Sequence, residues 1–244
     1  MIKLEKTETY GWEAAIRGMR NPMNSWEKSD SKFNVKRFLK FSDDSVVCFF
    51  DEMGCPFLLD GVELGPNDLD LARRLAKGGP VHAKYRRQIF VSVDITAPLY
   101  WWKEFDTYKV GTTANSCSTM HKIHAKEFTR EDFSCETLFD DNPRRYESND
   151  CFYSNIFDRY IMALNDAREM YLRTKDKKYW RVMIELLPSS YNQKRTVTMT
   201  YENLYNMYHS RKDHKLDEWR VGFCEWAKSL PYSELFTMEW EEKV

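Results

Sequence analysis

The segment 89–124 constrains the fold more than any other part of the sequence. Apolar side chains occupy every second position of 89–95, which predicts a half-buried β-strand. Pro98 ends this strand and suits the first turn of a helix that reaches about Thr107. A dense group of small polar and thiol residues follows: Thr112, Thr113, Asn115, Ser116, Cys117, Ser118 and Thr119. Such a group is poor material for a core, so we expect it to hold a polar ligand.

Charge and hydropathy exclude several classes of protein. The 37 Lys and Arg residues nearly balance the 38 Asp and Glu residues, so global charge predicts no nucleic-acid or membrane partner. No apolar run approaches the roughly 20 residues that span a bilayer. The start of the chain lacks the apolar core of a signal peptide. We therefore expect a cytoplasmic protein, in which the six cysteines are free thiols.

Local patterns predict one domain of mixed α+β class spanning 1–244. Strands are expected at 2–8, 45–50, 56–63, 89–96 and 195–200, and Asp60-Gly61 is expected to form a turn in a hairpin. Helices are expected at 12–20, 66–77, 98–107, 151–174, 176–187, 201–210 and 216–229. A helical turn is expected at 35–41, and Asn67 or Asp68 is expected to cap the helix that starts at Pro66.

The helix 151–174 is expected to keep one apolar face. Its members are Phe152, Ile156, Tyr160, Ala163, Ala167 and Tyr171.

Cys117, His121 and His124 form a string with zinc-ligand spacing. On a helix these three offsets would share a face. No fourth ligand is evident nearby and the string begins in a loop, so the pattern favours a polar face over a metal site.

Four polar residues near the C-terminus, Asn203, Asn206, Arg211 and His214, form a second cluster. The two amides lie on one face of the helix that starts at Tyr201, and the two cationic residues fall at its end. Such a group could grip a planar heterocycle by hydrogen bonds or a phosphate by charge. Cationic side chains at a helix C-terminus also complement the helix dipole, so both interpretations stay open.

No common nucleotide-binding or hydrolase motif is present. Arg86-Arg87 could meet a phosphate, although such pairs are more typical of a solvated surface. Trp101-Trp102 is expected to pack in the core.

Taken in order, three blocks resemble the flavin-dependent thymidylate synthases. The first is LARRLAKGGPVHAKYRRQIFVSVDI, which is similar to the stretch of that family in which a His and a nearby Glu contact flavin. His82 stands at the His position and Arg87 at the Glu position.

The second block, APLYWWKEFDTYKVGTTANSCSTMHK, resembles the signature of the family, which reads Arg-His-Arg, two residues, Ser, one residue, Asn, two residues, Ser, one residue, Arg-Tyr. With one inserted residue, Thr113, Asn115 and Ser118 stand at its Ser, Asn and Ser positions. Without the insertion, Thr112 and Cys117 take the two Ser positions. Both registers stay open.

In both registers the arginines that grip the substrate are missing. Either 108–110 or 107–109 replaces Arg-His-Arg. Because a nucleotide phosphate needs cationic donors, Lys109 is the expected point charge, with Arg86 or Arg87 as relocated donors.

The third block is LPSSYNQKRTVTMTYENLYNMYHSRKDHKLDEW, which resembles the Leu-Pro, strand, helix, Arg and His pattern of the family. Asn206 and Arg211 align without a gap, and His214 aligns after a one-residue deletion. In that family the Asn and His positions contact flavin and the Arg helps to bind the nucleotide.

The resemblance implies an α+β fold with a mostly antiparallel sheet flanked by helices, a homotetramer, and an active site built between subunits. It also implies FAD, NADPH and methylenetetrahydrofolate as cofactors, and dUMP or a related pyrimidine nucleotide as substrate. The leading prediction is therefore FAD-mediated methyl or hydride transfer in nucleotide biosynthesis. The alternative is a catalytically degenerate homologue that acts as a binding or assembly protein.

The predicted site residues fall into three groups, and no metal ligand is among them. They are Ser118 and Cys117 for catalysis, His82, Asn206, Arg211 and His214 for the cofactor, and Lys109, Thr113, Asn115 and Arg87 for the substrate. Cys117 can act as a nucleophile only if a neighbour such as Lys109 or His121 stabilises its thiolate, and a plain loop cysteine is the simpler interpretation.

Overall fold

The computed structural model describes residues 1–37, 59–139 and 150–238. The chain forms two compact units. Unit 1 consists of Met1–Thr7, Ser92–Thr198 and Arg211–Trp226, and unit 2 of Glu8–Val91, Met199–Ser210 and Ala227–Val244. That the whole chain, 1–244, is a single domain stays a prediction.

Helices and strands alternate irregularly along the chain, as expected for the α+β class. The strands are β1 (Lys3–Tyr10), β2 (Lys32–Arg37), β3 (Leu59–Glu63), β4 (Phe90–Pro98), β5 (Thr113–Ser116) and β6 (Asn192–Thr200). The α-helices are α1 (Trp12–Arg20), α2 (Pro66–Lys77), α3 (Leu99–Phe105), α4 (Thr119–Lys122), α5 (Asp150–Thr174), α6 (Lys177–Leu186), α7 (Tyr201–Arg211), α8 (Cys224–Lys228) and α9 (Glu234–Thr237). Short 3-10 turns and one π-helix, η7 (Glu218–Phe223), complete the described elements.

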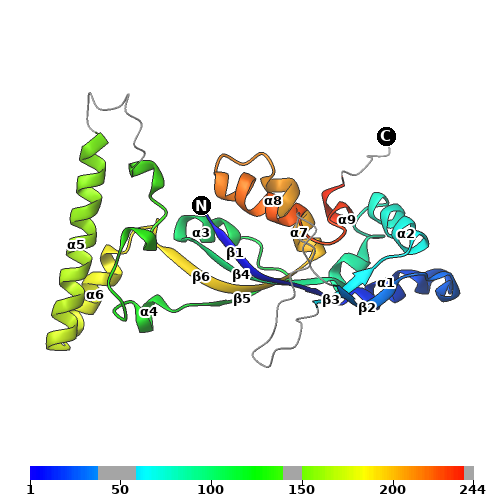
Figure 1. The fold of residues 1–244 in the computed structure, drawn as a ribbon, viewed down its shortest axis with the longest axis horizontal. Helices are drawn as coiled ribbons and strands as arrows, with labels where there is room; N and C mark the ends of the chain where they lie inside the picture. The colour runs from blue at the N-terminus through cyan, green and yellow to red at the C-terminus, as the bar shows by residue number, and fades with distance from the viewer. Residues whose placement is uncertain (38–58, 140–149, 239–244) are drawn as a thin grey trace. The chain divides into compact units, whose positions relative to one another are not determined.

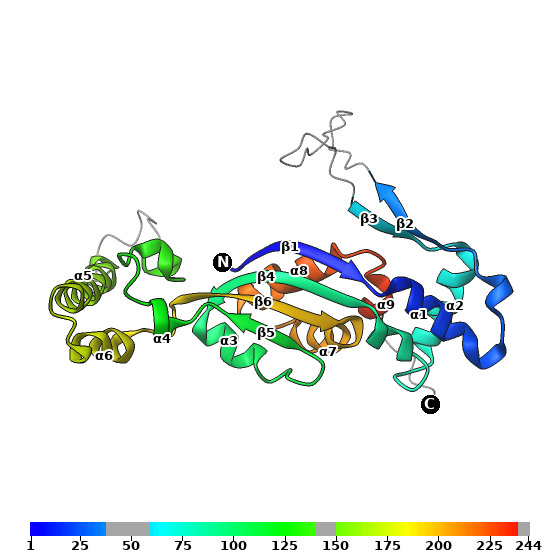
Figure 2. The same ribbon diagram turned by 90° about the horizontal axis from the view of Figure 1, so that it is seen from below.

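The main sheet has the strand order β1-β4-β6-β5, so β5 is an edge strand (Figures 1 and 2). β5 runs antiparallel to β6, with Thr113 opposite Thr198 and Asn115 opposite Thr196. The two faces of the sheet differ, because Val93, Ile95, Ala97 and Val197 are buried while their polar neighbours are not. The expected mostly antiparallel sheet flanked by helices is confirmed.

An aromatic cluster forms one core of unit 1. The indole of Trp101 lies 4.9 Å from Trp102, 5.2 Å from Phe105 and 4.5 Å from Trp219, measured between ring centroids. Trp101, Trp102 and Trp219 are almost fully buried, as the sequence predicted for the Trp101-Trp102 pair.

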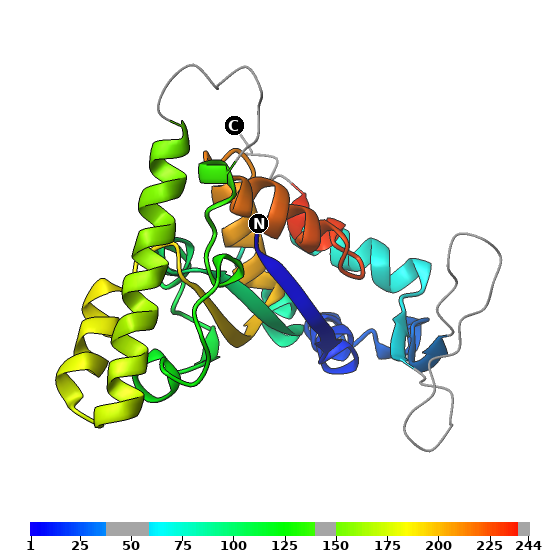
Figure 3. The same cartoon turned by 60° about the vertical axis from the view of Figure 1, so that its left-hand side comes forward.

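A second core of unit 1 lies between α5 and α6, which pack side by side (Figure 3). Ile161, Leu164, Ala167 and Met183 are buried there. The helix 151–174 was predicted correctly in extent but not in its apolar face, since Ile156 is 48% exposed.

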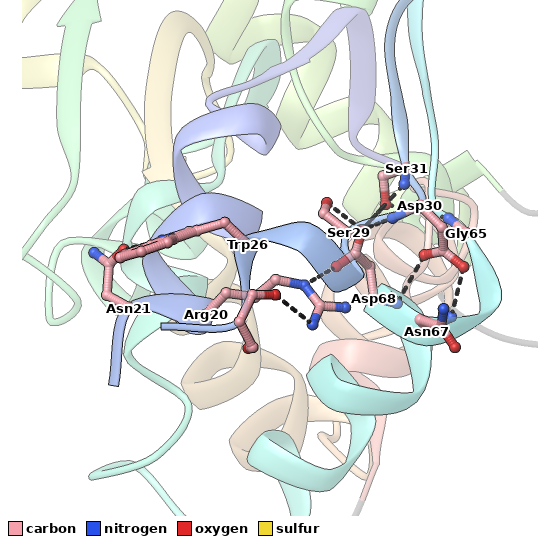
Figure 4. A network of polar contacts seen from close by, with 10 residues as sticks. Arg20, Asn21, Trp26, Ser29, Asp30, Ser31, Gly65, Asn67 and Asp68 are labelled. Carbon is pink, nitrogen blue, oxygen red and sulfur yellow. Dashed lines mark hydrogen bonds and ion pairs between the residues drawn. The ribbon is translucent and has the colours of Figure 1, made fainter. Parts of the chain in front are cut away.

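In unit 2, α1 and α2 are joined by a buried ion pair (Figure 4). Arg20 Nε donates to Asp68 Oδ1 at 2.6 Å, and the side chains are 4% and 0% exposed. Asp68 Oδ2 also accepts four hydrogen bonds from the segment 29–31, two from hydroxyls and two from backbone amides: Ser29 Oγ, Ser31 Oγ, Asp30 N and Ser31 N. Asp68 is therefore a structural residue of unit 2.

This network corrects the predicted cap of α2. The N-cap residue is Gly65, and the amides of Asn67 and Asp68 donate to the carboxylate of Asp30. The capping carboxylate thus comes from a distant segment, because Asp68 is already engaged with Arg20.

Two further predictions in unit 2 are wrong. The residues 35–37 belong to strand β2 and not to a helical turn. Asp60 and Gly61 lie within β3, opposite Lys36 and Val35, and not in a turn. Cross-strand pairing overrides the local turn signal at both places. The expected strand at 45–50 lies outside the described residues.

Cysteines and membrane-spanning potential were also predicted. Cys117, Cys135 and Cys224 form no disulfide, as expected, and the side chains of the other three cysteines, Cys48, Cys55 and Cys151, lie outside the described part of the chain. Within the described ranges, every helix is too short or too polar to cross a membrane.

Candidate functional site

One face of the main sheet in unit 1 is polar. Thr196 Oγ1 donates to Asp94 Oδ1 at 2.6 Å, and Lys194 Nζ lies 3.1 Å from Asp94 Oδ2. The hydrogen bond from Thr196, together with Lys194, lowers the pKa of Asp94 below its usual value. One step along the same face, the hydroxyls of Ser92 and Thr198 lie 2.8 Å apart.

The edge strand β5 extends this polar face. Thr113 and Asn115 are exposed and lie opposite Thr198 and Thr196, so their side chains share the face that carries Asp94. Of the dense polar group that the sequence places after α3, Thr113, Asn115 and Ser116 therefore lie on an edge strand and not in a loop. This strand joins the face of Asp94 through backbone pairing.

Cys117 and Ser118 directly follow β5. The amide of Cys117 donates to the carbonyl of Lys194, and its thiol is exposed. The hydroxyl of Ser118 accepts a hydrogen bond from the amide of His121 at 3.2 Å and so caps α4. In the described structure, therefore, Ser118 has a structural role that the sequence did not predict.

The Cys117, His121 and His124 string does not form a metal site in the structure. His121 is within α4, whereas Cys117 precedes the helix and His124 follows it. The ring of His124 packs against Tyr171, with 4.9 Å between centroids. In the described ranges, His, Cys, Asp and Glu side chains form no group that could hold a metal ion.

Arg211 and His214 converge on one carboxylate in unit 1. Arg211 Nη1 donates to Glu104 Oε2 at 2.7 Å, and His214 Nε2 lies 3.2 Å from the same oxygen. Arg211 ends α7 and Glu104 belongs to α3, so residues 107 positions apart in the sequence form the group. The sequence placed Arg211 and His214 together correctly but missed their carboxylate partner.

Aromatic rings form the walls of this cluster. The guanidinium of Arg211 lies 5.0 Å from the ring centroid of Trp219 and 5.6 Å from that of Tyr108. Arg211 Nε also donates to the hydroxyl of Tyr108 at 3.0 Å. Trp219 is in the π-helix η7, an element that often marks functional sites. Arg211 is thereby held by three residues, Glu104, Tyr108 and Trp219, and 17% of its side chain is exposed.

The remaining predicted cofactor residues, His82 and Asn206, belong to unit 2. Both side chains are exposed, and neither hydrogen-bonds to another residue in the described part of the chain. His82 follows the end of α2, where a Cβ on Gly78 would lie 3.2 Å from the imidazole. Asn206 lies on α7, five positions before Arg211.

The Arg86-Arg87 pair divides between two environments. Arg86 is 1% exposed, lies 3.7 Å from Glu202, and stacks 4.6 Å from the ring centroid of Tyr205. Arg87 is 57% exposed and lies 3.9 Å from Glu202. The interpretation of the pair as solvated surface is therefore wrong for Arg86, while Arg87 stays accessible. Close to this pair, burial raises the pKa of Tyr85 to about 12, and the opposing effect of Arg86 is smaller.

Several residues of these groups escaped the sequence analysis. Asp94 shows only the weak signal of a polar position in an alternating strand. Glu104 and Trp219 show none, because their partners lie on other elements. Lys109, which directly follows Tyr108 in the sequence, has an exposed side chain that makes no ion pair within the described ranges.

Comparisons with known proteins identify the fold. No family model matches the sequence, and no curated protein matches it. Thymidylate synthase X from Helicobacter pylori, solved with FAD and dUMP, superposes with a TM-score of 0.58 at 15% identity over 98% of both chains. A second structure, of the flavin-dependent thymidylate synthase ThyX from Helicobacter pylori complexed with FAD and dUMP, gives a TM-score of 0.57 at 15% identity over 96% of this chain and 97% of that one.

A third solved structure is the UMP/dUMP methylase PolB from Streptomyces cacaoi bound with 5-Br dUMP. It gives a TM-score of 0.55 at 16% identity over 97% of this chain and 94% of that one. The chain is thus similar in fold, over nearly its whole length, to flavin-dependent thymidylate synthases and to a dUMP methylase.

Proposed function

We propose that this chain, which has the fold of the flavin-dependent thymidylate synthases, binds FAD and a pyrimidine nucleotide and catalyses FAD-mediated methyl or hydride transfer to the base. Support comes from the ligands of the similar structures, which were solved with FAD and dUMP or with 5-Br dUMP. NADPH as reductant, methylenetetrahydrofolate as carbon donor and a homotetrameric assembly belong to the same proposal.

The observation that carries the proposal is the availability of His82 and Asn206. Each exposes a side chain that can both donate and accept, and none of its hydrogen-bonding atoms is used within the described part of the chain. A planar flavin ring offers acceptors and a donor along its edge, which fits an amide and an imidazole. When bound, flavin supplies the hydride and methylene chemistry, and the protein orients it.

Arg211 and His214 are less available than His82 and Asn206 to hydrogen-bond a flavin, because Glu104 already contacts both of them. We propose that Arg211 serves the nucleotide and that His214 keeps it in place through Glu104. In unit 1, Thr113 and Asn115 on the polar sheet face, with Lys109, would hold the rest of the substrate. Arg87, in unit 2, stays a proposed substrate residue in its own right.

Cys117 and Ser118 stay the proposed catalytic residues, with different support. The exposed thiol of Cys117 is accessible to a substrate. The hydroxyl of Ser118 is used as a helix cap, so we expect it to position the backbone beside Cys117.

A second candidate function is a non-catalytic binding or assembly protein. It is favoured by the Glu104 carboxylate, which neutralises a cationic site in a chain that already lacks the signature arginines. Binding of FAD without turnover of any pyrimidine nucleotide would support this alternative.

The test is flavin affinity in single variants. His82→Ala and Asn206→Ala should each weaken FAD binding about tenfold or more, because each removes hydrogen bonds to a bound ring. Asn155→Ala is the matched control, since Asn155 is also an exposed asparagine on a helix, here α5. Fluorescence quenching of FAD gives the dissociation constants, and equal affinity in Asn206→Ala and Asn155→Ala would refute the site.

A further inference from the structure

Glu104 is the feature of the cationic cluster that the proposed function does not explain. A pocket for a phosphate alone is built from cationic or neutral donors, because a nearby carboxylate repels the anion. Here the carboxylate of Glu104 stands 2.7 Å from Arg211 and 3.2 Å from His214. The negative charge of Glu104 therefore offsets the positive charge of Arg211, which makes this cluster a poor site for a phosphate.

The hydrogen-bonding capacity left in the cluster is specific. Glu104 Oε2 accepts from Arg211 Nη1, whereas no described residue donates to Glu104 Oε1. Arg211 uses Nε for Tyr108 and Nη1 for Glu104, and Nη2 has no acceptor among the described residues. An acceptor and a donor thus remain available on two side chains that are fixed to each other.

The carboxylate is also accessible. The side chain of Glu104 is 33% exposed, more than that of Arg211 at 17% or His214 at 21%, so part of it is open to a ligand while the ion pair is in place. Trp219 and Tyr108 hold the guanidinium from the other sides. A ligand group that matches this arrangement must present an N–H donor next to a carbonyl or ring-nitrogen acceptor.

We propose that Glu104 is a specificity residue that reads the N–H group on the edge of a pyrimidine base, while Arg211 donates to the neighbouring acceptor. The proposal rests on the proposed function and deepens it, since it assigns this cluster to the base and excludes the phosphate from it. The N3–H group of uracil and the exocyclic amino group of cytosine share the required chemistry. A base without an N–H group on this edge is rejected, because it leaves the carboxylate desolvated and without a donor.

The test compares ligands on the unmodified full-length chain in the presence of FAD. Isothermal titration calorimetry measures the dissociation constants of dUMP, dCMP and N3-methyl-dUMP. We expect N3-methyl-dUMP to bind at least about tenfold more weakly than the better of the two natural nucleotides, as expected when a site built for an N–H group meets a ligand that lacks it. Whether dUMP or dCMP is preferred identifies the donor that Glu104 reads.

A variant tests the charge. Glu104→Gln should weaken binding of the preferred nucleotide about tenfold, since a charged acceptor is replaced by a neutral one. It should also strengthen inorganic phosphate as a competitor, since the repulsive charge is gone. Glu185→Gln is the control, because Glu185 also pairs with an arginine, Arg181 Nε, at 2.7 Å.

The outcomes separate the inference from the function. If N3-methyl-dUMP binds as tightly as the better of dUMP and dCMP, or if Glu104→Gln leaves nucleotide affinity unchanged, the role of Glu104 is overturned and the proposed function stands. If the unmodified chain binds neither dUMP nor dCMP, both the proposed function and this inference are overturned.

Discussion

The ion pair between Arg20 and Asp68 allows a quantitative prediction. In Asp68→Ala the guanidinium of Arg20, 4% exposed, loses its carboxylate, and the hydrogen-bond donors of the segment 29–31 lose their acceptor. Breaking one side of a buried ion pair costs about 3–5 kcal/mol. The remaining contact of Arg20, from Nη1 to the carbonyl of Ser25 at 3.3 Å, is too long to offset this. We therefore expect Asp68→Ala to lower the free energy of unfolding by about 4 kcal/mol.

An exposed ion pair of the same type provides the control. Arg130 donates to Asp158 through two nitrogens, but the side chains are 54% and 39% exposed. Exposed pairs are worth about 0–1 kcal/mol, so Asp158→Ala should cost no more than that. Urea unfolding followed by tryptophan fluorescence measures both variants. A loss below about 1 kcal/mol in Asp68→Ala, equal to that in Asp158→Ala, would contradict the reasoning.

The same pair has a pH dependence. Burial raises the pKa of Asp68, but the hydrogen bonds from Ser31, Ser29 and Arg20 outweigh it, so the folded pKa lies below the ordinary value of 3.8. A carboxyl with a lowered pKa stabilises the fold above its unfolded pKa, and this stabilisation is lost as the pH falls through the folded pKa. Asp68→Ala should therefore lose more stability at pH 7 than at pH 3.

Two further predictions concern a backbone position and the thiols. Gly11 has φ +86°, and a Cβ at this position would lie 2.1 Å from the carbonyl oxygen of Gln88. Gly11→Ala should therefore lower the free energy of unfolding, measured in urea, by at least about 1–3 kcal/mol. A decrease below about 0.5 kcal/mol would refute the predicted strain. Burial, and to a smaller extent the charge of Glu136, raises the pKa of the Cys135 thiol. At pH 8 a disulfide reagent should therefore modify the exposed thiol of Cys117 much faster than the buried thiol of Cys135. Equal rates of modification in the folded protein would contradict the burial of Cys135.

Local signals predicted much of the fold. The alternation in β4 and the Pro66 start of α2 each act within a few residues, and the structure has both elements within two residues of the predicted bounds. Predictions failed where a distant segment decides the outcome. Asp60 and Gly61 are in a strand because Lys36 and Val35 pair with them.

The candidate site shows the same division. The sequence placed Arg211 and His214 together because they are three positions apart. It missed Glu104, which is 107 positions from Arg211, and so missed the negative charge that lies beside Arg211. Long-range side-chain pairing leaves no periodic pattern in one sequence.

Flavin binding is the central claim, and its direct test is the visible absorbance spectrum of the purified full-length chain before and after addition of FAD and size-exclusion chromatography. We expect flavin absorbance bands that co-elute with the protein and that change when dUMP or dCMP is added. A colourless protein fraction after incubation with FAD would contradict the proposed function and leave only the fold.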